Sequence, residues 1–257
     1  MGLGLRTALV RTGWRVKRRA RDTVLRRGGD IRTVRGDIAA RWLYGNGIEI
    51  GALDIPLQLP SGARVRYVDR KDLAGLRADF PNLADRAFVD VDVVDDGERL
   101  STFAPNSLDF VVANHMIEHT EDPLGTLAAH VRVLRPGGVL YLAVPDRRFT
   151  FDAVRERTPL EHHLRDHADG PAWSRRDHYR DWVRLVEKFD EADVEARAAQ
   201  LEADRASIHF HVWELEDFLG LAAEARARLG LPAHIIHGQA NDAEFVVVLR
   251  KDSPRAV

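Results

Sequence analysis

The chain has 257 residues, of which 45% are hydrophobic and 30% are charged, and its formal net charge is −2. This composition is typical of a globular protein with one large core and room for a small insertion. No stretch approaches the ~20 consecutive apolar residues that a membrane-spanning helix needs. The absence of cysteine excludes disulfides and thiolate metal sites, and it favours a reducing, cytoplasmic compartment.

Charge is unevenly distributed along the chain. Residues 1–35 contain eleven Lys and Arg and two Asp, a net +9, which leaves −11 for the remainder of a chain that totals −2. We expect this segment to be either a solvated basic arm or a contact with a membrane surface or a polyanion. Because the basic segment is terminal and the rest is acidic, we expect no nucleic-acid partner. The sequence leaves open whether the protein forms a homodimer.

Seven strands are predicted from short runs rich in Val, Ile, Phe and Tyr, at residues 47–50, 63–69, 87–94, 109–114, 139–145, 233–238 and 244–251. Alternation with helices and loops predicts an α/β fold with a doubly wound, Rossmann-like sheet. Helices are predicted over 124–134, before a Gly-Gly turn, and over 214–229, ending at Gly230. The short connection 239–243 predicts that the last two strands form an antiparallel hairpin at the sheet edge.

Residues 146–206 interrupt this alternation, and 179–204 have an amphipathic helical pattern. We interpret them as a helical lid over the carboxyl edge of the sheet. The predicted organisation is a basic arm (1–35), a Rossmann-like cofactor-binding core (36–145), the lid or substrate insertion (146–206) and a segment that completes the sheet (207–257).

Acidic residues follow the first three predicted strands, at the edge where open α/β sheets bind ligands. Glu49 and Gly51 end the first strand, and a glycine there lets a ligand approach the backbone. Asp69 ends the second, where an acid accepts hydrogen bonds from ribose hydroxyls. Asp96 and Gly97 follow the third, where a carboxylate can bind the exocyclic amine of adenine. Each acid alone could be a turn residue or a helix cap, but three in succession indicate a nucleotide site.

With these residues the chain resembles the class I S-adenosylmethionine-dependent methyltransferases, strongly over residues 40–145 and moderately over 206–251. The motifs that carry the resemblance are Glu49-Ile50-Gly51, Asp69, Asp96-Gly97, the 108–112 strand, Glu118-His119 with Asp122-Pro123, and Leu134-Arg135-Pro136-Gly137-Gly138. The resemblance implies an enzyme that binds S-adenosylmethionine through Glu49, Gly51, Asp69, Asp96, Gly97 and Asn114. The further glycines of the usual loop are missing after Gly51, which also argues against NAD.

His115, Glu118 and His119 follow the fourth strand at i, i+3 and i+4, which would place them on one face of a helical turn. Two imidazoles and a carboxylate can hold a divalent ion and leave positions open for a substrate. The string HMIEH also matches an inverted zinc-peptidase pattern. That pattern lies inside a long helix, whereas this string follows a buried strand.

The cluster resembles the Glu-x-x-Glu-His signature of two metal-dependent families, the ubiquinone-pathway O-methyltransferases and the small-RNA 2′-O-methyltransferases, with His115 in place of the first Glu. In the RNA-modifying family a further ligand precedes a Trp and the last large helix, and His209 and His211 precede Trp213 here. The resemblance implies a Mg²⁺ or Mn²⁺ site, with Zn²⁺ as an alternative, whose ligands are His115, Glu118, His119 and His211 or His209. The residues implied for catalysis are His119, His209 and His163.

An alcohol is a poor nucleophile until it loses its proton, and a metal ion or a histidine base assists that loss, so these residues favour oxygen as the methyl acceptor. Polar and aromatic lid residues suit a sugar or a solvated insertion: Asp146, Arg147, Arg148, His162, His163, Asp166, His167, Trp173, His178 and Tyr179. A looser resemblance extends to actinobacterial sugar O-methyltransferases. The predicted function is metal-assisted O-methylation of a sugar or polysaccharide precursor. The alternatives are a metal-free small-molecule methyltransferase with a histidine base, a non-enzymatic S-adenosylmethionine-binding module and a zinc hydrolase.

Overall fold

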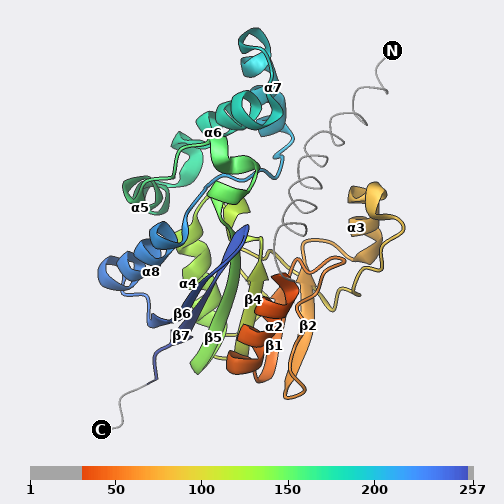
Figure 1. The fold of residues 1–257 in the computed structure, drawn as a ribbon, viewed down its shortest axis with the longest axis vertical. Coiled ribbons are helices and arrows are strands. Elements are labelled where there is room, and N and C mark those ends of the chain that lie inside the picture. Colours follow the sequence, from red (N-terminus) through yellow and green to blue (C-terminus); the bar gives the residue numbers. More distant parts are fainter. Residues whose placement is uncertain (1–30, 254–257) are drawn as a thin grey trace.

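The computed structural model describes residues 31–253, and most of the predicted basic arm, residues 1–30, lies outside this range. The strands form a seven-stranded sheet with the order β3-β2-β1-β4-β5-β7-β6, and Figure 1 shows how the labelled strands lie among the helices. The strands are β1 (Gly45–Ile50), β2 (Ala63–Asp69), β3 (Val93–Val94), β4 (Leu108–Asn114), β5 (Leu134–Pro145), β6 (Ala233–Asn241) and β7 (Glu244–Lys251). Strands β1 to β5 are parallel, and β7 is antiparallel to both β5 and β6. The predicted doubly wound, Rossmann-like sheet with an antiparallel last strand is confirmed.

The α-helices are α2 (Ile31–Trp42), α3 (Leu73–Asp79), α4 (Pro123–Val133), α5 (Leu160–Asp169), α6 (Arg175–Asp181), α7 (Glu191–Ala203) and α8 (Leu215–Leu229). Local sequence explains where two of them begin and end. The Asp122 side chain accepts from Gly125 N at 2.8 Å and caps α4, which begins at a proline. Helix α8 begins with a capping box between Glu214 and Asp217 and ends at Gly230, whose φ is +66°.

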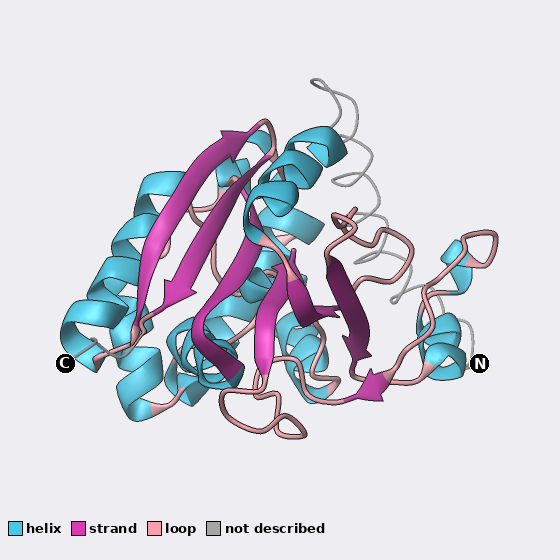
Figure 2. Ribbon diagram, turned by 90° about the horizontal axis from the view of Figure 1, so that it is seen from below, coloured by secondary structure: helices cyan, strands magenta, loops and turns pink. Residues whose placement is uncertain are grey.

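The sheet is covered by helices on both faces, as Figure 2 shows. Strand residues alternate between two apolar clusters because successive side chains of a strand point to opposite faces. Phe110 and Val112 of β4 pack with α2, while Val111 and Ala113 pack with residues of α4 and α8. Residues 31–35, expected in the basic arm, belong to α2, and Ile31 is buried.

Two predicted elements differ in length from those observed. The third strand is reduced to Val93–Val94, because Phe88 instead packs against Leu76 and Leu83 of the α3 region. Strand β5 begins earlier than predicted, at Leu134, which pairs with Leu108 across an irregularity in the ladder.

The lid has a small apolar core of its own, and in Figure 1 it lies beyond the carboxyl ends of the parallel strands. The predicted helix over 179–204 is interrupted, because α6 continues as a π-helical segment, Trp182–Glu187, that ends at Lys188 in the left-handed conformation (φ +59°). Residues 207–213, which we call the strap, return from the lid to α8, and Phe210 N donates to Glu118 O at 2.8 Å. Within the described residues, none of the helices is sufficiently long and apolar to cross a bilayer.

Candidate functional site

Glu49 is a buried carboxylate near the end of β1. Both of its oxygens lie 3.0 Å from Leu57 N, and Oε1 accepts from Asn114 Nδ2 at 3.3 Å. Burial raises the pKa of Glu49 to about 7, although the hydrogen bond from Leu57 and the charge of Arg35 act in the opposite direction. Glu49 therefore holds the loop after β1 and exchanges its proton near neutral pH.

Two residues near Glu49 suit a ligand: Gly51 leaves space for it, and Asn114 offers a hydrogen-bond acceptor. Gly51 has φ +66°, and within the described structure no atom lies within 4 Å of a Cβ built on it. The Oδ1 atom of Asn114 is buried and accepts no hydrogen bond from residues 31–253. A buried acceptor without a partner is unfavourable, and a ligand's ammonium group would satisfy it. These features fit the amino-acid end of S-adenosylmethionine.

The remaining predicted cofactor residues follow the neighbouring strands β2 and β3. Asp69 is partly buried, its Oδ1 accepts from Arg70 N at 2.7 Å, and burial raises its pKa. Asp96 is exposed and accepts from Glu98 N at 2.9 Å. A Cβ on Gly97 would lie 2.6 Å from the Ile50 side chain, so this position requires glycine. The fold thus lines up all six predicted residues along one sheet edge, at the ends of four adjacent strands.

Glu118 lies at the centre of three imidazoles. Its Oε1 atom is 3.9 Å from His115 Nδ1, from His119 Nε2 and from His209 Nε2. Candidate ligand atoms of Glu118, His119 and His209 all lie within 4.8 Å of one another. We call these three residues the Glu118 cluster. Glu118 and His119 belong to the 3-10 turn Ile117–His119 after β4, and His209 belongs to the strap.

Hydrogen bonds fix which nitrogen of His119 and His209 faces Glu118. His119 Nδ1 lies 2.8 Å from the carbonyl oxygen of Ile208, which can only accept, so this nitrogen carries the proton. His209 Nδ1 likewise donates to Asp152 Oδ2 at 2.7 Å. In its neutral form each ring therefore presents an Nε2 lone pair to the cluster, as metal-ligating and proton-accepting histidines do.

Asp152 is a residue that the sequence patterns did not identify. Burial would raise its pKa, but His209 and Arg155 outweigh that effect and hold the pKa below its ordinary value. Arg155 Nη1 donates to Asp152 Oδ1 at 2.9 Å and to His209 O at 2.8 Å. No local pattern marks this aspartate, because its partner lies 57 residues later in the chain.

His115 is oriented differently from the sequence expectation. It has φ +51° and precedes the helical turn, so it does not share a helical face with Glu118 and His119. Its Nδ1 lies 3.9 Å from Glu118 Oε1, while its Nε2 lies 2.8 Å from Glu244 Oε2. Glu244 also binds Arg35 through two contacts. His115 thus lies beside the cluster and is tied to the Arg35–Glu244 pair.

His211 and His163 also depart from their expected positions. Residues 209 and 211 would share one side of a regular strand, but Arg155 donates to the consecutive carbonyls of His209 and Phe210, so the strap is not regular there. His211 Nε2 instead lies 3.6 Å from Asp166 Oδ2, away from the Glu118 cluster. His163 Nε2 accepts from Trp213 Nε1 at 3.0 Å, and burial lowers the pKa of His163 to about 3. His211 is therefore not positioned as a ligand beside Glu118, nor is His163 positioned as a base there.

Many of the lid side chains that we expected to bind a sugar contact other residues of the protein. Arg147 Nη1 donates to Glu214 at 3.0 Å, and Arg148 Nη2 donates to Asp146 at 2.7 Å. Tyr179 is 2% exposed, whereas Trp173 is 39% exposed. The lid therefore offers a sugar fewer free groups than its composition suggests.

The central part of the chain is similar to a known protein family. The family described as "Methyltransferase domain" matches residues 38–142. The chain carries a class I S-adenosylmethionine-dependent methyltransferase domain. This domain includes the six predicted cofactor residues, and it makes the chain an enzyme, which sets aside the non-enzymatic binding module.

Solved methyltransferase structures are similar to this chain. A SAM-dependent methyltransferase from Aquifex aeolicus is 10% identical, with a TM-score of 0.50, over 93% of this chain and 98% of that one. A methyltransferase from Methanosarcina mazei is 16% identical, with a TM-score of 0.45, over 82% of this chain and 94% of that one. The CurJ carbon methyltransferase is 15% identical, with a TM-score of 0.42, over 82% of this chain, which spans only 49% of that structure. A comparison with curated proteins found no match.

Proposed function

We propose that this methyltransferase transfers a methyl group from S-adenosylmethionine to a hydroxyl of a sugar or polysaccharide precursor, assisted by a divalent metal ion. The observation that carries the proposal is the Glu118 cluster. Two imidazoles, of His119 and His209, and the Glu118 carboxylate converge where the turn after β4 meets the strap. S-adenosylmethionine supplies an electrophilic methyl group, so the protein must position an acceptor and assist the loss of its proton.

The donor set of the Glu118 cluster fits a divalent ion. Glu118, His119 and His209 would hold the ion and leave positions open for oxygen ligands. Such an ion would favour the ionised form of an acceptor hydroxyl. Adjacent hydroxyls that chelate the ion are common in sugars, and this chemistry supports the acceptor class. An amine acceptor would need neither the ion nor a base.

A metal-free mechanism is the second candidate, and the Asp152–His209 hydrogen bond of 2.7 Å favours it. Asp152 would orient His209 and stabilise its imidazolium while His209 Nε2 removes the acceptor proton. General-base catalysis of this kind contributes roughly 10²- to 10⁴-fold.

Methyl transfer from labelled S-adenosylmethionine to a panel of sugars with vicinal hydroxyls tests the proposal, with each matching deoxy sugar as control. We expect EDTA to abolish transfer and Mg²⁺ or Mn²⁺ to restore it, and we expect Glu118→Gln to remove that response. Full activity after chelation would favour the metal-free mechanism. Transfer to amines alone would contradict O-methylation.

A further inference from the structure

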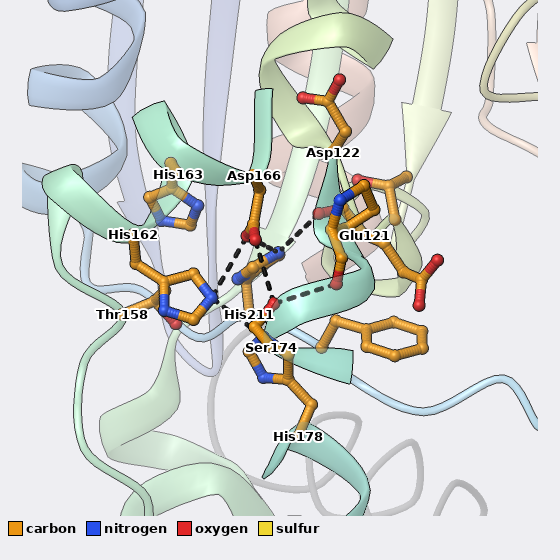
Figure 3. Close-up of polar contacts among 12 residues, drawn as sticks. Glu121, Asp122, Thr158, His162, His163, Asp166, Ser174, His178 and His211 are labelled. Carbon is orange, nitrogen blue, oxygen red and sulfur yellow. Dashed lines mark hydrogen bonds and ion pairs between the residues drawn. The ribbon is translucent and has the colours of Figure 1, made fainter. Parts of the chain in front are cut away.

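A second group of metal-ligating side chains lies in the lid, apart from the Glu118 cluster (Figure 3). It contains His162 and Asp166 of α5, His178 of α6 and His211 of the strap. One candidate ligand atom from each residue lies within 4.8 Å of all the others. We call these four residues the lid cluster.

The distances within the lid cluster suit tetrahedral coordination. His162 Nε2 lies 3.0 Å from His178 Nε2 and 3.1 Å from Asp166 Oδ2, and His211 Nε2 lies 3.6 Å from Asp166 Oδ2. A tetrahedral zinc ion with ligands at about 2.05 Å separates its donor atoms by about 3.3 Å. The observed distances bracket that value, so small side-chain shifts would complete such a site.

Burial makes a bound cation favourable in the lid cluster. Asp166 and His211 are buried, His178 is half-buried, and Asp166 Oδ2 makes no hydrogen bond to the described residues. A divalent ion would compensate the charge of a carboxylate that lies buried among three imidazoles.

A hydrogen bond from Ser174 already orients the Asp166 carboxylate. Ser174 Oγ donates to Asp166 Oδ1 at 2.9 Å, which directs Oδ2 toward the histidines, as outer partners of metal ligands do. His211 Nε2 lies 3.3 Å from the Glu121 carbonyl, a long hydrogen bond that metal binding would replace. Three imidazoles and one carboxylate suit zinc, and four protein ligands are typical of a closed structural site.

We propose that His162, Asp166, His178 and His211 form a structural zinc site that fastens the lid helices α5 and α6 to the strap. This site is separate from the Glu118 cluster and does not depend on how the methyl acceptor is activated. Its role is to stabilise the lid, because it joins the neighbouring helices α5 and α6 to the strap, which follows only after α7 in the sequence.

The proposal is tested by measuring how much zinc the full-length protein binds. The zinc is measured by elemental analysis after the protein has been saturated with zinc and desalted. We expect His178→Ala to bind about one equivalent less than wild type, with affinity for the lost ion lowered roughly 100-fold or more. His119→Ala should keep that equivalent, because it alters only the Glu118 cluster. His234→Ala, a partly exposed histidine on β6, is the matched control. His162→Asn, at a half-buried ligand position, is a second variant of the same site. Unchanged zinc content in both His178→Ala and His162→Asn would overturn the proposal.

Thermal melting of the wild-type protein provides a second readout, which does not require any variant to fold. Zinc added to metal-stripped wild type and to stripped His119→Ala should raise Tm, because a ligand that binds only the folded state stabilises it. Co²⁺ in place of zinc should give the visible bands of a tetrahedral site. An unchanged Tm of stripped wild type on zinc addition would contradict the site, whatever the variants do.

Discussion

Asp152 Oδ2 accepts a hydrogen bond of 2.7 Å from His209 Nδ1, and this contact joins the start of the lid to the strap. The contact leaves His209 Nε2 facing Glu118 Oε1 at 3.9 Å. Under either proposed mechanism the Nε2 lone pair must face the acceptor side, and Asp152 fixes the tautomer and the ring orientation that place it there.

Asp152→Asn should therefore lower kcat by roughly 10- to 100-fold while leaving the Kd for S-adenosylmethionine unchanged. Steady-state kinetics and calorimetric titration of the cofactor check this. Asp181→Asn, an exposed aspartate of α6, is the matched control. Because Asp152 also pairs with buried Arg155, a thermal melt must show that the variant is folded. Wild-type kcat in a folded variant would contradict the orienting role.

Asp69→Ala should weaken binding of S-adenosylmethionine by roughly 1–3 kcal/mol, through lost hydrogen bonds to the ribose hydroxyls. Metal content should not change, since Asp69 ends β2 and belongs to neither metal-ligand cluster. Calorimetry of cofactor binding checks the change, with the exposed Asp85→Ala as control. Equal affinity in the two variants would remove Asp69 from the cofactor site.

Cofactor affinity should rise with pH through about 7, the raised pKa of Glu49. Below that pH the carboxyl is protonated and neutral; above it the carboxylate attracts the ammonium group of S-adenosylmethionine. Calorimetry between about pH 6 and pH 8 measures the slope, and Glu49→Gln should flatten it. The same slope in wild type and variant would assign the titration to another group.

The Arg35–Glu244 pair should make stability depend on acid pH. Burial alone would raise the pKa of Glu244, but Arg35 and then His115 outweigh it and lower the pKa from 4.5 to about 2. The stabilisation is therefore complete above pH 4.5, the ordinary value, and is lost as the pH falls toward 2. Arg35→Met should lower the free energy of unfolding at pH 7 by about 3–5 kcal/mol, because it leaves a buried carboxylate without its partner. Urea unfolding of both proteins at pH 7 and pH 3 measures this, and an equal loss at both pH values would contradict the assignment.

The sheet could be predicted from the sequence because its strands are short runs rich in Val, Ile, Phe and Tyr. The cofactor edge could be predicted too, since Glu49, Asp69 and Asp96 each follow a strand, and parallel strands end at one edge. The weakest prediction was the third strand, where Phe88 is apolar but packs against α3.

The arrangement of the histidines could not be predicted from spacing. His115 turns to Glu244, a residue of the last strand, and His211 joins helices α5 and α6. These outcomes depend on tertiary contacts over more than thirty residues of sequence, and the left-handed backbone at His115 has no local signal. The two separate clusters follow from the irregular strap, where Arg155 binds consecutive carbonyls.

The most direct test of the account is a paired measurement on His119→Ala, with turnover and S-adenosylmethionine affinity determined on the same preparation and compared with His234→Ala. We predict that turnover is abolished while the Kd for S-adenosylmethionine stays within a few fold of wild type, because the Glu118 cluster acts on the acceptor. Loss of cofactor binding, or turnover equal to that of His234→Ala, would contradict the placement of methyl transfer at this cluster.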